Sequence, residues 1–413
     1  MEEVKDQQQQ GPDHRRLGYD LDLFTFSDLV GPGLPLFTPR GTILRDELYG
    51  FTEELQKRAG YQKVAIPHIT KEDLYKVSGH WDKFGHELFL VKSQETKDQM
   101  VLKPMNCPHH IQIYASRPRS YRELPIRYFE NTIQYRDEKK GELSGLSRVR
   151  SISIDDAHIF CRLEEIEAEF TTIMEMIKEL YGVFGMEFRA RLSFRDDSEG
   201  YLGSKETWDR AQGIIEDVAK KLNLDYFVAE GDAAFYGPKI DILLKDSLGR
   251  EHQLATEQLD FVMPERFKLT YIDKDGKDQT PVMLHKALLG SVERFLSVYL
   301  EHTNGNFPLW LAPEQLRVIT LNEDETIVKL AKEVVEKANS AGVRAGLDDS
   351  NESVGKKVRE AELMKIPYAI VIGGKEVESG RVTARHRGDL PELSEMTVDE
   401  LLQRLSDDTK ARK

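Results

Sequence analysis

The spacing of apolar residues predicts amphipathic helices in the larger, N-terminal part of the chain. Over residues 42–60, apolar side chains recur three or four positions apart, and Gly60 follows them as a helix end. The same spacing predicts helices over residues 163–180 and 205–222. We also interpret residues 282–302 (VMLHKALLGSVERFLSVYLEH) as one helix whose apolar residues face inward.

Alternating apolar and polar residues predict strands between these helices. Residues 124–138 contain one strand, residues 148–160 alternate as the returning strand, and the charged loop 137–147 joins them into a long hairpin. Two further strands follow over residues 236–261, joined by a turn through Gly249. Mostly antiparallel strands with helices packed against them predict an α+β fold.

The pattern changes after the segment FPLWLAPEQ, in which Pro308 and Pro313 flank a short apolar stretch. Beyond it, strands and helices alternate over residues 314–413, which predicts a separate α/β domain. We therefore expect a polar tail over residues 1–12, an α+β domain over residues 13–310 and this smaller C-terminal domain.

Composition places the chain among globular proteins. It has 413 residues, of which 39% are hydrophobic, and no apolar run approaches the roughly 18 residues of a membrane span. The N-terminus lacks the apolar core of a signal peptide. Two cysteines are too few for a disulfide framework, so we expect a cytoplasmic protein without a membrane partner. The net charge of −14 argues against a general nucleic-acid coat but allows a local RNA-binding patch.

The stretch KPMNCPHH, residues 103–110, holds one of the two cysteines, Cys107, beside two histidines. An isolated cysteine is usually a small buried apolar residue, whereas a thiolate with two imidazoles holds a metal ion. His158 and His285 are candidate partners, but they lie much farther along the chain than the ligands of zinc fingers do. Lone histidines also commonly serve the core or the surface, so spacing alone leaves both interpretations open.

Nucleotide binding would have to use an unusual surface. The sequence contains no GxxxxGK[ST] loop, no GxGxxG opening a helix and no HExxH pair. Arginines cluster around the predicted hairpin instead, among them Arg136, Arg148 and Arg150. Arginines on hairpins are most often solvated, and that alternative stands beside a phosphate-binding role.

Five stretches, in order along the chain, resemble the threonyl-tRNA synthetase family of class II aminoacyl-tRNA synthetases: KPMNCP, RVR…DDAHIF, AFYGPKIDI, QLDF and HKALLGSVERF. The resemblance runs from about Asp13 to the end of the chain and includes the three signature motifs of the class, while the class I signatures HIGH and KMSKS are absent. It implies an antiparallel sheet flanked by helices, followed by a C-terminal anticodon-binding domain. It also implies ligation of threonine to tRNA(Thr) through threonyl-adenylate, by a homodimer formed through residues 42–67.

The resemblance assigns the binding of ATP and its magnesium ion to one group of side chains. Arg136 would hold the α-phosphate, Glu138 the adenine amino group, and Arg294 the purine face and outer phosphates. The full group is Arg136, Glu138, Arg148, Ile152, Gln253, Ser291 and Arg294. Catalytic roles fall to Arg136, Arg294 and His80, the last as a proton acceptor in the transfer to tRNA. For His80, a histidine that stabilises a turn is the alternative.

Zinc-based recognition of threonine is a further implication of the resemblance. The family's single zinc ion corresponds to the ligands Cys107, His158 and His285. The open side of the ion takes the threonine hydroxyl, which valine lacks, and a site built around a hydroxyl strongly rejects its absence. The side chains that would line the amino-acid site are Asp156, Tyr236, Lys239 and Gln258.

In the C-terminal domain, the resemblance assigns the reading of anticodon bases to Asn351, Glu376 and Arg385. Polar side chains of this kind read the edges of unstacked RNA bases. The segment RVTARHR, residues 381–387, is interpreted as a strand that supplies local positive charge. A solvated edge strand is the alternative interpretation.

The sequence departs from the family pattern at several positions. Ile152 stands where an aromatic ring usually stacks on adenine, and Ile154 where glutamine is usual. The loss of stacking predicts weaker ATP binding, by roughly 1 kcal/mol. His109 replaces a glycine, and Ala255 and Glu257 are further departures expected around the active site.

Most family members carry N-terminal domains, one of which hydrolyses seryl-tRNA, and this chain begins almost at the catalytic domain. We therefore expect charging without editing in cis. The alternative is that the sequence is a shortened form of a longer protein. Two other interpretations are a synthetase-like RNA-binding or regulatory protein without charging activity, which Ile152 and Ile154 favour, and a zinc hydrolase that activates water. The hydrolase leaves the C-terminal domain unexplained.

Overall fold

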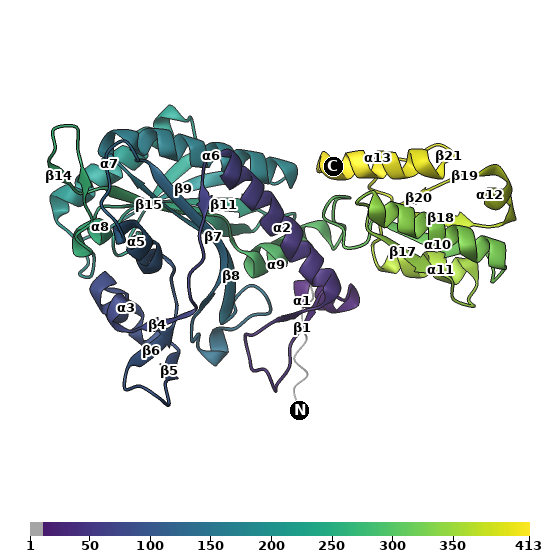
Figure 1. Ribbon diagram of the computed structural model, residues 1–413, viewed down its shortest axis with the longest axis horizontal. Coiled ribbons are helices and arrows are strands. Elements are labelled where there is room, and N and C mark those ends of the chain that lie inside the picture. The colour runs from purple at the N-terminus through teal and green to yellow at the C-terminus, as the bar shows by residue number, and fades with distance from the viewer. Residues whose placement is uncertain (1–10) are drawn as a thin grey trace, which may run out of the picture. The chain divides into compact units, whose positions relative to one another are not determined.

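The computed structural model describes residues 11–413 (Figure 1), so most of the predicted polar tail, residues 1–10, lies outside the described part. Contacts divide the described chain into two compact units. The larger contains residues 26–35 and 49–298, and the smaller contains residues 11–25, 36–48 and 299–413. The first residues of the predicted larger domain thus belong to the unit that holds the C-terminal domain. Within residues 11–413, no helix has the length and apolar character needed to cross a membrane.

An eight-stranded sheet forms the centre of the larger unit. Its strands follow the order β10-β9-β11-β12-β15-β8-β7-β3, and all neighbours are antiparallel except the pairs β10–β9 and β3–β7. The strands are β3 (Gln62–Lys63), β7 (Ile126–Tyr135), β8 (Ser151–Cys161), β9 (Phe188–Phe194), β10 (Tyr226–Glu230), β11 (Lys239–Lys245), β12 (Glu251–Asp260) and β15 (Val282–Ser291). The predicted hairpin, β7 and β8, and the strand pair β11 and β12 are confirmed.

One predicted helix is wrong in its first half. Residues 282–291 form strand β15 in the middle of the sheet, and only Val292–Thr303 form helix α9. The strand is mostly apolar, apart from His285 and Lys286, because it lies in the middle of the sheet with both of its faces buried, so it shows no simple alternation. The change of structure falls at Gly290, which has φ +71° and whose Cβ position lies 2.4 Å from Leu254 O, so that only glycine fits.

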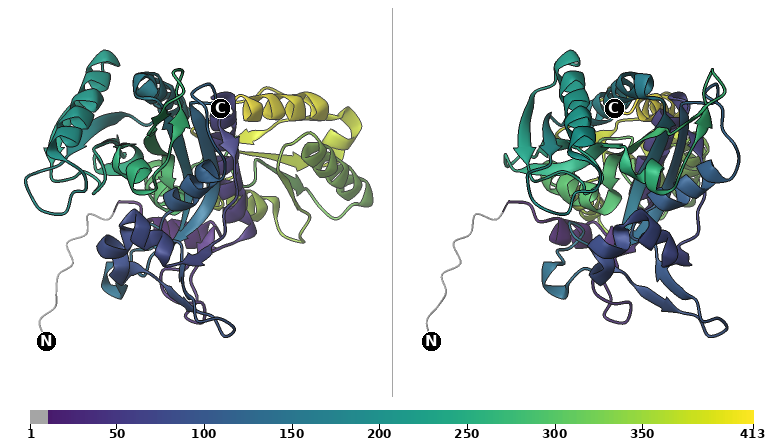
Figure 2. Two further views of the ribbon diagram at one scale, coloured as in Figure 1. Left: turned by 60° about the vertical axis from the view of Figure 1, so that its left-hand side comes forward. Right: turned by 90° about the vertical axis from the view of Figure 1, so that its left-hand side faces the viewer.

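Helices cover both faces of this sheet. Helices α6 (Ile166–Val183) and α7 (Lys205–Lys221) pack together on one face (Figures 1 and 2), and Tyr181 Oη of α6 donates to Leu288 O at 2.7 Å. Helix α5 (Cys107–Ala115) lies on the other face, where its apolar side chains join those of β7, β8 and β15. Its residues Cys107, Ile111 and Tyr114 are buried there.

Shorter elements complete the larger unit. A three-stranded sheet has the order β4-β6-β5, and the short helices α3 and α4 lie between β4 and β5 in the chain. These elements are β4 (Ile69–Lys71), α3 (Asp73–Ser78), α4 (His80–Phe84), β5 (Leu90–Lys92), β6 (Gln99–Leu102), α8 (Val262–Arg266), β13 (Tyr271–Ile272) and β14 (Asp278–Gln279).

The smaller unit contains the predicted α/β domain. Its four-stranded sheet, β17-β16-β18-β20, is parallel except at β20, with α10 and α13 covering one face and α11 the other. The elements are β16 (Leu316–Thr320), α10 (Glu325–Ser340), β17 (Ala345–Asp348), α11 (Val354–Leu363), β18 (Tyr368–Ile372), β20 (Arg385–His386) and α13 (Val398–Lys410). Alternate residues of β16 and β18 serve the two cores, as expected for a sheet covered on both faces.

Two features of this unit differ from the prediction or were missed by it. The segment 381–387 is not one strand, because β19 (Arg381–Val382) pairs with β21 (Met396–Thr397), whereas β20 pairs with β18. A short helix, α12 (Gly374–Ser379), precedes it. The N-terminal elements of the chain are α1 (His14–Asp20), β1 (Phe24–Thr25), β2 (Leu36–Phe37) and α2 (Pro39–Arg58), the last matching the predicted helix.

The face of the large sheet that meets α6 buries several charged side chains. Glu257 of β12 and Lys286 of β15 are direct neighbours across the strands, and both are almost completely buried. Lys286 Nζ donates to Gln56 Oε1 at 2.6 Å, whereas neither carboxylate oxygen of Glu257 has a hydrogen-bond partner among the described residues. Burial raises the pKa of Glu257 well above its ordinary value. The folded protein therefore holds a proton at this carboxyl up to a higher pH than the unfolded chain does.

We predict that Glu257→Leu raises the free energy of unfolding at pH 8 by about 1–3 kcal/mol, because it removes a buried carboxyl without a partner. A raised carboxyl pKa destabilises the folded state progressively as the pH rises above the unfolded value. The gain should therefore be smaller at pH 5 than at pH 8. Lys286 keeps Asp155 as its main electrostatic partner in this variant.

Thermal unfolding at the two pH values measures this difference. The matched change Glu251→Leu removes an exposed carboxylate of the same strand and should shift the midpoint equally at both. A gain for Glu257→Leu that does not depend on pH would contradict the prediction.

Candidate active site

Strand register brings the predicted site residues together. Five strands carry one continuous row of paired residues, in which Lys239 faces Gln258, Gln258 faces His285, His285 faces His158, and His158 faces Tyr128. Side chains of directly paired residues point to the same face of a sheet. Two histidines from distant parts of the chain therefore become immediate neighbours in the sheet centre.

The next row on the same face lies two residues along each strand, as the alternation of side chains requires. It consists of Asp241, Thr256, Ala287, Asp156 and Glu130. The predicted substrate residue Asp156 is thus placed beside the histidine row. Ala255 and Glu257 alternate with Thr256 and Gln258, so these two departures lie on the opposite face and not in the site.

Cys107 completes a cluster of three metal-ligating side chains. It opens helix α5, and its sulfur and the ring nitrogens of His158 and His285 all lie within 4.8 Å of one another, fully buried. Burial raises the pKa of the Cys107 thiol, so a thiolate there requires a cation beside it. One sulfur and two imidazole nitrogens form a donor set that suits zinc and leaves a coordination position open. The residues present therefore fit the predicted metal.

One of the two imidazoles is held by a carboxylate that the sequence analysis did not single out. His285 Nε2 lies 2.9 Å from Asp260 Oδ2, and Asp260 Oδ1 accepts the backbone N–H groups of Val262 and Met263 at 2.7 and 2.9 Å. A histidine that donates through Nε2 presents the lone pair of Nδ1 to a metal. Asp260 belongs to the quoted QLDF stretch, which is the signal by which it could have been found.

The predicted amino-acid residues surround this cluster. Asp156 Oδ2 accepts hydrogen bonds from Asn106 Nδ2 at 2.8 Å and Gln134 Nε2 at 3.3 Å, and burial raises its pKa. The Tyr236 ring stacks on the His285 ring with centroids 4.8 Å apart, and the Tyr236 hydroxyl donates to Gln258 Oε1. These contacts fix the orientation of polar groups around one small volume.

Lys239 is held by a second buried carboxylate that sequence reasoning missed. Asp241 is fully buried, and it accepts from Lys239 Nζ at 2.8 Å and from Gln253 Nε2 at 2.7 Å. Further donors to it are Arg191, Ser193 and Thr256. Asp241 therefore fixes both a predicted substrate residue and a predicted nucleotide residue.

A cavity of 470 Å³ adjoins these groups on the same face. It is lined by all seven predicted nucleotide residues: Arg136, Glu138, Arg148, Ile152, Gln253, Ser291 and Arg294. Ile154 also lines it, so both isoleucine departures face the space that the nucleotide would occupy. The structure therefore brings the predicted group together, while the role of each member stays a prediction.

The cavity carries strong positive charge although the chain is acidic overall. Arg148 pairs with Glu138 at 2.7 Å and Glu142 at 2.6 Å, whereas no described carboxylate lies within ion-pair distance of Arg136 or Arg294. Burial lowers the pKa of Arg136, and its Nη2 contacts only Met105 Sδ, at 3.3 Å. A half-buried guanidinium without a carboxylate partner is suited to an anionic ligand.

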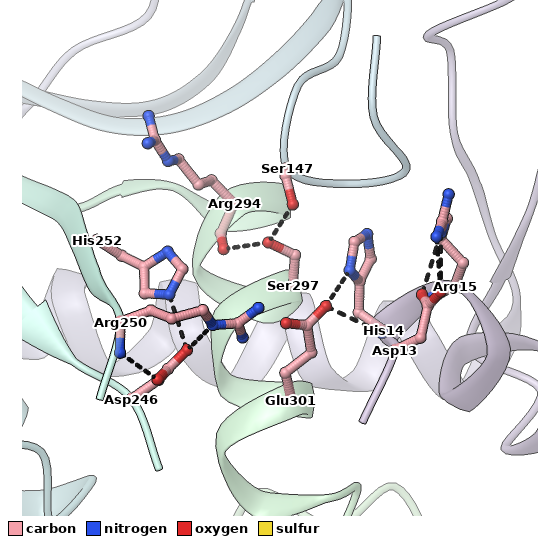
Figure 3. Close-up of polar contacts among 10 residues, drawn as sticks. All are labelled: Asp13, His14, Arg15, Ser147, Asp246, Arg250, His252, Arg294, Ser297 and Glu301. Atoms are coloured by element: carbon pink, nitrogen blue, oxygen red, sulfur yellow. Dashed lines mark hydrogen bonds and ion pairs between the residues drawn. The ribbon is translucent and has the colours of Figure 1, made fainter. Parts of the chain in front are cut away.

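The hairpin loop that supplies these arginines is tied to helix α9. Ser147 Oγ donates to Ser297 Oγ at 3.0 Å, and Ser297 Oγ donates in turn to the carbonyl oxygen of Arg294 at 2.8 Å (Figure 3). The Ser291 hydroxyl accepts the backbone N–H of Arg294 at 3.0 Å and so caps the start of α9. The two sides of the cavity are thereby held in place before any ligand binds.

His80 lies deeper than a proton acceptor for a tRNA end would suggest. It is fully buried, with Nδ1 2.8 Å from Ser78 Oγ and Nε2 3.8 Å from Cys107 Sγ. Burial lowers its pKa to about 3, so the ring is neutral at physiological pH. The structure thus places His80 beside the metal-ligand cluster, and its part in the transfer step stays a prediction.

The three predicted anticodon residues occupy separate elements of the smaller unit. Asn351 is exposed after β17, Glu376 of α12 accepts the backbone N–H of Gly373 at 2.9 Å, and Arg385 of β20 is exposed beside a cavity of 360 Å³. Arg387, expected to add positive charge, is instead engaged by Phe307 O at 2.6 Å and by Asp389. These contacts offset part of its charge, and its contribution to RNA binding stays a prediction.

Two known protein families match the chain in succession. Residues 89–303 match the tRNA synthetase class II core domain (G, H, P, S and T), and residues 315–408 match the anticodon binding domain. The first match runs from β5 to α9 and includes every strand of the central sheet except β3, and the second covers the four-stranded sheet with its helices. The fold and the site therefore define the core of a class II aminoacyl-tRNA synthetase.

Comparison with individual proteins shows which class II synthetases the chain resembles most clearly. The threonine–tRNA ligase of Synechococcus elongatus is 46% identical over 401 residues, which span 95% of this chain and 66% of that protein. The Staphylococcus aureus JH9 protein of the same name is 43% identical over 97% of this chain and 62% of its own length. The solved RNA binding domain of threonyl-tRNA synthetase from Cryptosporidium parvum Iowa II superimposes with a TM-score of 0.90 at 38% identity, covering 96% of this chain and 98% of that one.

The chain belongs to the threonyl-tRNA synthetase family. It spans 62% to 66% of the length of the two curated relatives described above.

We predict that Asp241→Asn lowers the free energy of unfolding by about 1–3 kcal/mol, because it replaces an acceptor of several buried donors by a group that is itself partly a donor. Urea or thermal unfolding measures the change. The matched variant Asp232→Asn removes an exposed carboxylate that pairs with the same arginine, Arg191, at 3.1 Å, and it should change stability little. An equal change in the free energy of unfolding for the two variants would contradict the prediction, because it would show that the burial of Asp241 does not increase its contribution to stability.

Proposed function

We propose that the chain activates threonine with ATP and transfers the threonyl group to the 3′-terminal ribose of tRNA(Thr). The main support is the register of the sheet, which sets a Cys–His–His cluster next to an arginine-rich cavity on one face. The names of the curated relatives, threonine–tRNA ligase, support the same conclusion. A pocket for an amino acid beside a pocket for a nucleotide is the arrangement that adenylate formation requires.

Different residues of the cavity bind different parts of ATP in the first reaction. A threonine carboxylate oxygen attacks the α-phosphorus of ATP, and pyrophosphate leaves with its magnesium ion. Arg136 stabilises the negative charge that builds up on the α-phosphate, and its burial strengthens this interaction. Glu138, which Arg148 orients, accepts a hydrogen bond from the adenine amino group. Arg294 lies over the face of the purine.

The Cys107, His158 and His285 cluster is proposed to hold one zinc ion. Bound there, zinc would supply a Lewis-acidic position for the hydroxyl and amino groups of threonine. Asp156 accepts the hydroxyl proton in a hydrogen bond, and Tyr236 and Gln258 close the pocket around the amino acid. Valine leaves these polar groups unpaired, so the site disfavours it strongly, whereas serine retains the hydroxyl.

The second reaction adds the RNA partner. His80 is proposed to accept a proton from the terminal ribose. Its ring is fully buried, so the ribose can reach it only if the surrounding segment moves. Asn351, Glu376 and Arg385 are proposed to read anticodon bases through their edges. Residues 42–67, which include α2 and β3, are proposed to form the contact of a homodimer.

Threonine-dependent exchange of pyrophosphate into ATP tests the proposed activity directly. We expect the unmodified chain to catalyse exchange with threonine, more weakly with serine, and not with valine. Arg136→Ala should lower the rate about 10²- to 10³-fold, as loss of one transition-state donor does. Arg122→Ala, which changes an exposed arginine outside the cavity, should leave it unchanged. A chain that supports no threonine-dependent exchange would contradict the proposal and favour an RNA-binding protein without charging activity.

The two cysteines provide a matched test of the metal. Both are buried thiols, but only Cys107 lies with the two histidines. We expect about one zinc ion per chain in the unmodified protein and in Cys161→Ala, and none in Cys107→Ala after dialysis, because three ligands are needed to retain the ion. Elemental analysis measures the zinc. Retention of zinc by Cys107→Ala would overturn the ligand assignment.

A further inference from the structure

The two imidazoles of the Cys–His–His cluster have different partners. His285 donates to the Asp260 carboxylate, whereas His158 contacts another histidine, His110, with the two Nδ1 atoms 2.8 Å apart. The His110 and His158 rings are perpendicular, with centroids separated by 4.7 Å. His110 lies one turn into helix α5, three residues after Cys107. Helix α5 therefore supplies one member of the cluster and the partner of another member.

The contact restricts which nitrogen of each ring carries a proton. A neutral imidazole that binds a metal through one nitrogen must carry its proton on the other. His158 Nδ1 faces His110, so Nε2 is the nitrogen that remains for a metal. His158 Nδ1–H must then donate to the lone pair of His110 Nδ1, and the proton of His110 must lie on Nε2.

His110 has no other side-chain hydrogen bond that would explain its place in the core. Its ring is completely buried, and its Nε2 has no partner among the described residues. Apart from packing against Tyr128, its polar interaction is directed at His158 alone. A buried imidazole with a single hydrogen bond is costly, which is a reason to look for a role in that bond.

We propose that His110 is a positioning residue, whose hydrogen bond fixes the tautomer and ring orientation of His158 for metal binding. The inference rests on the zinc site of the proposed function. An imidazole is a suitable acceptor here because it adds no charge. A carboxylate in its place would add a further buried negative charge near Asp156, whose Oδ1 lies 3.8 Å from His158 Nε2.

Zinc affinity of the full chain, measured by competition with a chelating dye, tests this role. His110→Phe keeps a ring but removes the acceptor, and it should weaken zinc binding about 10- to 100-fold, as loss of an outer-shell partner does. His110→Asn places an amide oxygen near the position of Nδ1 and should restore most of the affinity. The matched control is His109→Phe, since His109 is the adjacent buried histidine and neither of its nitrogens has a described partner. It should leave the affinity unchanged.

A direct readout requires no substitution. In ¹⁵N–¹H correlation spectra of the histidine-labelled, zinc-loaded chain, His158 should carry its proton on Nδ1 and His110 on Nε2. The visible spectrum of the cobalt-substituted protein should change in His110→Phe and be restored in His110→Asn, because it reports the orientation of the ligands around the ion.

Several results would overturn the proposal. These are unchanged zinc affinity in His110→Phe, equal weakening in His110→Asn or His109→Phe, or the opposite tautomer of His158. The experiments distinguish failure of the proposed activity from failure of the proposed role of His110. A chain that binds zinc with His110-dependent affinity but catalyses no threonine-dependent exchange overturns the proposed activity alone, whereas a chain that binds no zinc overturns the metal site together with this inference.

Discussion

Backbone pairing between β12, β15, β8 and β7 is the constraint on which the site depends. The register sets Gln258, His285, His158 and Tyr128 side by side, although they come from four separate segments. A slip of one residue in β15 would turn His285 towards α6 and bring Lys286 into the site. Because β15 lies in the middle of the sheet and both of its faces are buried, such a slip would also force its side chains to pack against the wrong neighbours on each face. The same packing that stabilises the sheet therefore fixes the ligands.

The groups around the site are held by partners that are themselves buried. Asp260 anchors His285 and is anchored by two backbone N–H groups, and Asp241 joins Lys239 to Gln253. Such arrangements cost free energy to bury but leave the functional side chains little freedom to move. Arg136 is the exception, because it is half-buried and no described carboxylate lies within ion-pair distance of it. Its positive charge stays unpaired within a chain of net charge −14, which suits the proposed binding of an anionic ligand.

The departures from the family pattern have unequal consequences. Ile152 and Ile154 line the arginine-rich cavity, so they face the space in which the proposed nucleotide would stack. Glu257 lies on the opposite face next to Lys286, and its effect is on stability and its pH dependence. His109 is buried beside His110 but makes no described hydrogen bond. The position of a departure in the sequence did not show whether it faces the site. Adjacent residues of a strand point to opposite faces, so neighbours in the sequence can have different effects.

The sequence by itself determined most helices, the long hairpin, the two-part organisation and the set of candidate site residues. These are local features, because hydrophobic periodicity, turn residues and sequence motifs each lie within a single segment of the chain. Only the tertiary structure decided that residues 282–291 form a strand, because a fully buried strand and a buried helix share the same mostly apolar run. It also decided the partners His110, Asp260 and Asp241. Their contacts join segments far apart in the chain, and the pairing of those segments depends on long-range packing that no local pattern contains.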